Sequence, residues 1–246
     1  MRIPAKIAFY FGSQELAVGL APLVVGTLSS LEARFPAPGR KVCCDVVEVR
    51  LDKTGRPEFW MECCKEIQNR GWPVLLTVRL KSEGGSWEGP DEERFDILHE
   101  AIEGLAGVDV EWSSKIAHPL AMFAKIRHKV CVISYHNFHK TPPVEELVSI
   151  IREAEDIASV VKISTRLNCE EDEETLHSLL GMKWKRPLCV IGMGTAWTHT
   201  RVSFPLLGSC LTYGYLDKPT APGQISAAEL TRRLREKMAA SVKPKH

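Results

Sequence analysis

Lys162 stands in an unusual position for a charged side chain. It interrupts residues 160–164 (VVKIS), a run that is otherwise apolar enough to form a fully buried strand. An unpaired ammonium would be costly there, and burial favours the neutral amine. Because a neutral lysine amine attacks ketones, the position indicates Schiff-base chemistry. The alternative is a lysine that reaches the end of the strand and serves as an anion contact or ion-pair partner.

A histidine follows another strand-like run. His136 comes after VCVIS and opens the loop Tyr135-His136-Asn137-Phe138-His139. Histidine can take and return a proton near neutral pH, so beside a lysine one strand away it becomes a general acid/base candidate. A histidine at a strand end can equally be structural. His139, three residues further on, is interpreted as a surface residue of the loop.

Charged residues also alternate within a strand-like run. Glu48 and Arg50 are two residues apart, so both side chains point to the same face of a strand. They could form an internal salt bridge or contact a ligand. Arg50 together with Arg79 and Arg201 would create a local cationic pocket for a carboxylate or another anion.

The elements that must position these side chains alternate along the chain. Short β-branched or Leu-rich runs are separated by longer amphipathic stretches, which is typical of βαβ units and a parallel sheet. Eight repeats of about 25 to 30 residues favour a closed (β/α)8 TIM barrel, and 246 residues are enough for one. We predict strands at 22–28, 43–50, 73–79, 108–112, 129–135, 158–164, 187–193 and 208–214.

Helices are predicted between the strands, and a hairpin before them. The hairpin combines residues 6–11 with 14–18 and is expected to close the bottom of the barrel. No linker composition divides the chain, so we expect a single barrel domain over 1–246. The predicted helices lie at 29–35, 56–70, 91–105, 116–126, 143–156, 171–181, 201–206 and 226–239.

Composition excludes several classes of protein. The 32 Lys+Arg and 31 Asp+Glu residues give a net charge of +1, which argues against binding to nucleic acid or to an anionic membrane. No GxGxxG motif or P-loop points to a nucleotide fold. The eight cysteines lack zinc-site spacing, so we expect reduced thiols, no metal, and a cytoplasmic protein without a signal peptide.

Six motifs in order resemble type I 3-dehydroquinate dehydratase, the Schiff-base enzyme of the shikimate pathway to aromatic amino acids. The resemblance covers about residues 22–224. The motifs are Asp45-Val-Val-Glu48-Val-Arg50-Leu-Asp52, Thr77-Val-Arg79 with Glu83-Gly-Gly, Ser134-Tyr-His136-Asn-Phe with Thr141-Pro142, Val161-Lys162-Ile, Gly192-Met193-Gly194 with Arg201, and Ala221-Pro-Gly-Gln224-Ile.

The resemblance implies a role for each matching residue, and it implies no cofactor. Lys162 would form an imine with the ring ketone of 3-dehydroquinate, His136 would remove the neighbouring proton and help expel water, and Glu83 would orient His136. The remaining positions are substrate contacts: Glu48, Arg50 and Arg79 at ring hydroxyls, Arg201 at the carboxylate, Met193 and Tyr213 in the pocket wall, and Thr220 and Gln224 on a closing loop. The resemblance also implies a homodimer.

Two departures from the family pattern lie near the predicted pocket. Thr220 replaces the usual serine and keeps its hydroxyl. Trp197 stands where the family has glycine, and we expect its ring to reshape the loop before Arg201 or to narrow the pocket. No role is predicted for Thr27.

Two other functions compete with the dehydratase. Another Schiff-base barrel lyase of the aldolase type would share a lysine on the sixth strand, but would not require the Glu48 and Arg50 pair. A non-catalytic binder of shikimate-type acids would not need Glu83, His136 and Lys162 together.

Overall fold

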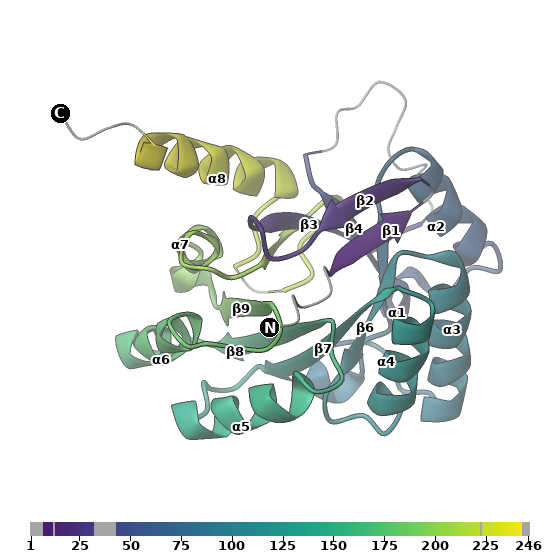
Figure 1. Ribbon diagram of the computed structural model, residues 1–246, viewed down its shortest axis with the longest axis horizontal. Coiled ribbons are helices and arrows are strands. Elements are labelled where there is room, and N and C mark those ends of the chain that lie inside the picture. The colour runs from purple at the N-terminus through teal and green to yellow at the C-terminus, as the bar shows by residue number, and fades with distance from the viewer. Residues whose placement is uncertain (1–6, 12, 32–42, 222, 243–246) are drawn as a thin grey trace, which may run out of the picture.

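Eight parallel strands form a nearly closed barrel, confirming the predicted (β/α)8 class (Figure 1). The computed structural model describes residues 7–11, 13–31, 43–221 and 223–242. In sheet order the strands are β10 (Leu211–Tyr215), β3 (Leu23–Leu28), β4 (Val46–Arg50), β5 (Val74–Thr77), β6 (Gly107–Glu111), β7 (Val130–Asn137), β8 (Val160–Arg166) and β9 (Leu188–Met193).

The barrel closes between β9 and β10 without a regular ladder. Single hydrogen bonds bridge this seam, including one from the amide of Cys210 to the carbonyl of Leu188 at 2.9 Å. The Ser209 hydroxyl accepts the amide of Val190 at 2.9 Å at the same place. The inward side chains of β9 and β10 are therefore held close enough to share one cavity.

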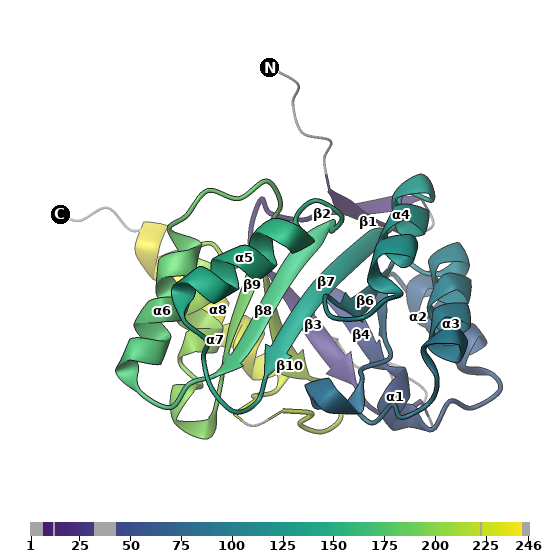
Figure 2. The same ribbon diagram turned by 90° about the horizontal axis from the view of Figure 1, so that it is seen from below.

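The helices lie outside the barrel (Figure 2). None of the helices within the described residues is long and apolar enough to cross a membrane. The α-helices are α1 (Leu51–Thr54), α2 (Trp60–Asn69), α3 (Asp91–Gly104), α4 (Ala117–Ile126), α5 (Val144–Ala154), α6 (Glu170–Leu180), α7 (Thr200–Leu206) and α8 (Ala227–Val242), with 3-10 turns η1 (Lys81–Glu83) and η2 (Thr195–Trp197).

Alternation along each strand divides the side chains between two cores. On β4, Val47 and Val49 pack outward against the helices, whereas Val46 packs inward. Because successive side chains alternate, Glu48 and Arg50 share the inward face with Val46. The inner face is apolar near the start of the strand and charged at its end.

A hairpin covers the end of the barrel at which the strands begin (Figure 2). β1 (Ala8–Phe11) pairs antiparallel with β2 (Gln14–Ala17), as predicted. Phe9 is fully buried among the apolar side chains that face the inside of the barrel. It lies so close to Gly107 that a Cβ added to Gly107 would be 3.3 Å from the Phe9 ring. The hairpin therefore seals one end of the barrel with apolar side chains and leaves the other end open.

Several predicted boundaries were wrong. The second strand begins at Val46 instead of residue 43, and a short helix, α1, follows it directly. The strands predicted at 129–135 and 158–164 extend to Asn137 and Arg166. Most of the helix predicted at 29–35 lies outside the described residues.

Candidate active site

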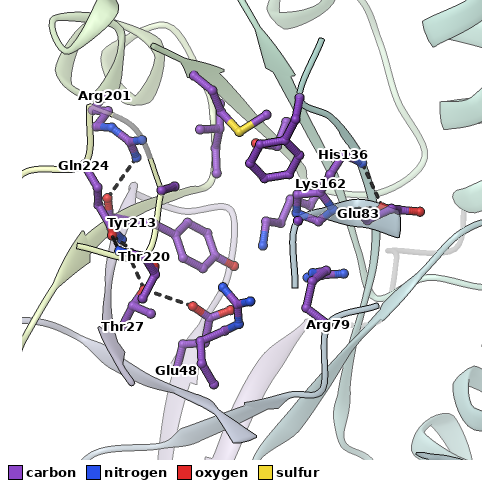
Figure 3. A pocket seen from close by; sticks show the side chains of 17 residues that line it. Thr27, Glu48, Arg79, Glu83, His136, Lys162, Arg201, Tyr213, Thr220 and Gln224 are labelled. Carbon is purple, nitrogen blue, oxygen red and sulfur yellow. Dashed lines mark hydrogen bonds and ion pairs between the residues drawn. The ribbon is translucent and has the colours of Figure 1, made fainter. Parts of the chain in front are cut away.

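A cavity opens at the end of the barrel where the strands finish (Figure 3). All the predicted catalytic and substrate-binding residues line it: Glu48, Arg50, Arg79, Glu83, His136, Lys162, Met193, Arg201, Tyr213, Thr220 and Gln224. The lining also includes Thr27, Gly84, Phe138, Ser164, Ile191 and Ala221.

Lys162 is buried and ion-paired. Its Nζ lies 3.0 Å from Oδ2 of Asp109, a fully buried carboxylate on β6. The other oxygen of Asp109 accepts hydrogen bonds from Arg79 at 2.5 Å and from Ser134 at 2.6 Å. Burial alone would raise the pKa of Asp109, but the charges of Arg79 and Lys162 hold it well below its usual range. Asp109 thus stays ionised and fixes the position of the amine.

A second buried ion pair supports Arg79 from behind. Arg79 Nη1 donates to Oε1 of Glu111 at 2.9 Å, and the other oxygen of Glu111 accepts from Arg94. Arg94 is fully buried on α3 and also donates to the hydroxyl of Ser114 at 2.6 Å. Paired charges of this kind are costly to separate, so the chain of ion pairs holds Arg79 rigidly.

His136 is hydrogen-bonded to Glu83. The ring Nδ1 and the backbone amide of His136 each lie 3.0 Å from Oε2 of Glu83, and Ser113 donates to the other carboxylate oxygen at 2.8 Å. Burial, together with the charges of Arg79 and Lys162, holds the pKa of His136 well below its usual value. The contact is therefore a hydrogen bond from a neutral ring and not an ion pair, and Nε2, which has no hydrogen-bond partner among the described residues, can accept a proton.

Burial raises the pKa of Glu83 to about 7, although Arg79 and the hydrogen bond from Ser113 oppose this rise.

Glu83 ends the 3-10 turn η1, and two glycines follow it. Gly84 has a φ of +76°, and a Cβ there would lie 2.3 Å from the ring of Phe138. A Cβ at Gly85 would lie 2.0 Å from the carbonyl oxygen of Arg79. Only glycines let this turn approach the strand ends closely enough to place Glu83 beside His136.

Glu48 is held by hydroxyls on both sides. Its two carboxylate oxygens accept hydrogen bonds from Thr27 at 2.9 Å and from Thr77 at 2.8 Å. Arg50 instead donates two hydrogen bonds to Asp52, at 2.9 and 2.8 Å. The two charged residues therefore have separate partners within the described structure.

The loop after β10 is linked to Glu48 through Thr27 (Figure 3). Gln224 Oε1 accepts hydrogen bonds from the amide and hydroxyl of Thr220 at 2.7 and 3.0 Å, and its Nε2 donates to the Thr27 hydroxyl at 3.4 Å. Thr27, for which no role was predicted, thus connects this loop to Glu48.

Arg201 has one nitrogen free for a ligand. Its Nε and Nη1 donate to the carbonyls of Gly223 and Tyr213 at 3.0 and 3.2 Å, but its buried Nη2 has no hydrogen-bond partner among the described residues. Burial lowers the pKa of Arg201 to about 10. A buried cation with an unused donor favours an anion such as a carboxylate.

Trp197 does not narrow the pocket, so that part of the expectation was wrong, and whether it reshapes the loop stays a prediction. Trp197 does not line the cavity, but is one of the residues that line an outer groove between α6 and α7, together with Glu173 and Phe204. The Trp197 carbonyl accepts the Thr200 hydroxyl at 2.8 Å, which stabilises the turn before Arg201. His139 is exposed, as predicted.

Sequence reasoning missed the buried acids behind the lysine. Asp109 and Glu111 alternate with valines in β6 (GVDVE), in the same pattern that singled out Glu48 and Arg50. Applying that rule to this strand would have identified both. Nothing local marks Arg94, because its side chain reaches the site from a helix.

The site is rich in charge, but among the described residues no cluster of three or more His, Cys, Asp or Glu side chains could hold a metal ion. What the site contains is an amine, a neutral imidazole beside a carboxylate, and a free guanidinium nitrogen. Such a set can form an imine with a ketone, move a proton and hold an anion.

Comparisons with known proteins agree with this chemistry. A 3-dehydroquinate dehydratase from Methanothrix thermoacetophila is 37% identical over 216 residues, covering 87% of this chain and 91% of that protein. One from Methanocella arvoryzae is 35% identical over 193 residues, covering 78% and 86%. The solved structure of the Enterococcus faecalis 3-dehydroquinate dehydratase has a TM-score of 0.78 at 26% identity, covering 89% and 95%.

The family model for type I 3-dehydroquinase matches residues 20–239, which include every strand of the barrel and every residue of the cavity. On this match and on the two relatives, the chain belongs to the type I 3-dehydroquinase family.

Proposed function

We propose that this chain dehydrates 3-dehydroquinate to 3-dehydroshikimate through a Schiff base on Lys162. The observation that carries the proposal is the meeting of three groups in one cavity: the Lys162 amine, the Nε2 side of His136, and the Arg201 Nη2, which has no hydrogen-bond partner among the described residues. They match the ketone, the acidic C–H bond and the carboxylate of the substrate.

The reaction begins when Lys162 gives a proton to His136 Nε2 and its neutral amine attacks the ring ketone, after which His136 returns that proton to the carbinolamine oxygen. The resulting carbinolamine loses water and becomes an iminium, which withdraws electrons from the neighbouring C–H bond. His136 Nε2 takes the proton from that carbon, and the electron pair forms an enamine. The enamine expels the hydroxyl two carbons from the imine carbon, His136 returns the proton so that water leaves, and hydrolysis of the imine releases product and Lys162.

Binding roles complete the proposal. Arg201 holds the carboxylate through its free nitrogen, and Glu48, Arg50 and Arg79 face the ring hydroxyls. Met193 and Tyr213 form the wall, and Thr220 and Gln224 close the cavity from the loop after β10. Glu83 is a positioning residue, because it acts through His136.

Reductive trapping tests the proposal. Adding 3-dehydroquinate and borohydride should increase the mass of the intact protein by one reduced adduct, while ultraviolet absorbance reports the conjugated product. Lys162→Ala should lose both signals, whereas Lys125→Ala, which removes an exposed lysine on α4, should keep both. An adduct without product from the unmodified chain would favour an aldolase-type lyase, and binding without an adduct would favour a non-catalytic binder.

We also propose that residues 1–246 form one domain, that the protein acts as a homodimer, and that it works in the cytoplasm. No disulfide joins any of the eight cysteines, all of which lie among the described residues, and this supports a reducing compartment. The exposed apolar side chains of Met122 and Ile126 on α4 support contact with a second copy. Light scattering during size-exclusion chromatography would measure the mass in solution, and one cooperative unfolding transition would support a single domain.

A further inference from the structure

Tyr213 brings an unused hydroxyl into the cavity. Its ring is 5% exposed on β10, and the phenolic oxygen is buried with no hydrogen-bond partner among the described residues. A buried hydroxyl without a partner is unfavourable, and buried tyrosines usually find one. In Figure 3 the oxygen points toward the centre of the cavity, between Lys162 and Glu48.

The neighbouring protein groups are already occupied. Glu48 accepts the hydroxyls of Thr27 and Thr77, one on each carboxylate oxygen. Asp109 accepts Lys162, Arg79 and Ser134. These contacts hold both acids in place near the phenol without using it, so the Tyr213 hydroxyl is available to an oxygen atom of a bound molecule.

The rest of Tyr213 fixes where this hydroxyl lies. The Lys162 Nζ sits over the ring, 4.3 Å from its centroid, in a cation–π contact. The Tyr213 backbone carbonyl accepts Arg201 Nη1 at 3.2 Å. One residue therefore contacts the groups that would hold the ketone carbon and the carboxylate.

The hydroxyl acts as a donor. Burial, together with the nearby Cys189 and the negative charges of Glu48 and Asp109, raises the pKa of Tyr213 well above its usual value. The phenol therefore remains protonated and offers its hydrogen to an oxygen atom of the ligand.

We infer that the Tyr213 hydroxyl donates a hydrogen bond to the substrate hydroxyl on the ring carbon next to the imine carbon, on the side opposite the carbon that loses its proton. His136 and Tyr213 lie on either side of Lys162, so the carbon deprotonated by His136 faces away from Tyr213 (Figure 3). The other neighbour of the imine carbon carries a hydroxyl and faces Tyr213 and Glu48. This inference rests on the proposed dehydration, and it makes Tyr213 a specificity-determining residue for hydroxylated ring ketones.

The test crosses a variant with a substrate analogue. Tyr213→Phe keeps the ring under Lys162 and removes only the hydroxyl. With 3-dehydroquinate, kcat/KM should fall roughly 5- to 30-fold, as expected for the loss of one buried hydrogen bond. With the analogue that carries hydrogen in place of that ring hydroxyl, Tyr213→Phe and the unmodified protein should differ less than twofold, because the partner of the phenol is already missing.

Tyr215→Phe is the matched control, since it removes a hydroxyl from the same strand outside the cavity lining and should leave both substrates unaffected. Equal losses with both substrates in Tyr213→Phe would overturn the inference, because the hydroxyl would then serve the fold or the lysine. No loss with 3-dehydroquinate would overturn it as well. Failure of the unmodified protein to form product or a borohydride adduct would instead count against the proposed function.

Discussion

One carboxylate oxygen of Glu83 accepts two hydrogen bonds from His136, one from the backbone amide and one from the ring Nδ1, each 3.0 Å long. Because a carboxylate can only accept, we assign the ring proton to Nδ1. The other ring nitrogen, Nε2, is then an acceptor. A single acid thus fixes the position, orientation and tautomer of the imidazole.

Removing the imidazole should separate the two halves of the reaction. In His136→Ala the Lys162 amine remains, so borohydride should still trap an adduct, although more slowly. Dehydration should fall by about 10²- to 10⁴-fold, which is the usual contribution of a positioned acid/base group. Intact mass and absorbance measured on the same samples would check both outcomes. Normal turnover by this variant would assign the proton transfer to another group.

The pH dependence should follow Glu83. Its pKa is raised to about 7, so as the pH falls through about 7 Glu83 takes up a proton and no longer stabilises the imidazolium that forms on His136. The pKa of His136 is well below its usual value, so the ring itself stays neutral over this range. The acid limb of kcat/KM should therefore lie near pH 7. Glu83→Gln should lower kcat and abolish this limb in profiles recorded from about pH 5 to 9; a limb unchanged in the variant would contradict the assignment.

Asp109 should matter for stability as well as for activity. Asp109→Asn would leave the charges of Arg79 and Lys162 without their shared buried counter-ion. Breaking one side of a buried ion pair costs about 3–5 kcal/mol, so the free energy of unfolding should fall by that order in urea titrations. Asp156→Asn, which breaks an exposed pair with Lys185, should change it little. Equal losses of unfolding free energy in the two variants would show that the buried Asp109 contributes no more to stability than an exposed ion pair.

Arg201 should govern recognition of the carboxylate. Arg201→Gln removes the charge and the free nitrogen that we assign to the substrate, so kcat/KM should fall roughly 10- to 100-fold, mainly through KM. Initial rates over a range of 3-dehydroquinate concentrations would measure this. Arg233→Gln on the outer face of α8 gives the matched control and should leave KM unchanged. An unchanged KM in Arg201→Gln would place the carboxylate elsewhere in the cavity.

The strand pattern made much of the site predictable. Lys162 follows the inward Val160 on β8, and Glu48 and Arg50 follow the inward Val46 on β4, so their charges were visible as exceptions. The extension of β7 to Asn137 was not visible, because His136 and Asn137 are polar and resemble loop residues. In the structure they pair with Ser164 and Thr165 of β8, which sets His136 beside the strand that carries Lys162.

Trp197 stands where the family has glycine, and the sequence alone could not show where the larger side chain would lie. A large residue before Arg201 suggested a narrowed pocket, but Trp197, at the end of η2, lines the groove between α6 and α7 instead of the cavity. The direction of a side chain in an irregular turn depends on the local backbone and on neighbouring helices. Neither is encoded in the spacing of the motif.

The sequence by itself determined the repeat of strands and helices, the inward charged positions and the residues available for imine and proton chemistry, because each depends on local periodicity and residue type. Only the tertiary structure decided which of these groups are neighbours. The Asp109 carboxylate came to Lys162 from two strands away, Arg94 reached the network from a helix, and Thr27 contacts both Glu48 and Gln224, the latter 197 residues further along the chain. These contacts arise when the barrel closes and buries charges that must then find partners, a requirement set by burial and not by sequence distance.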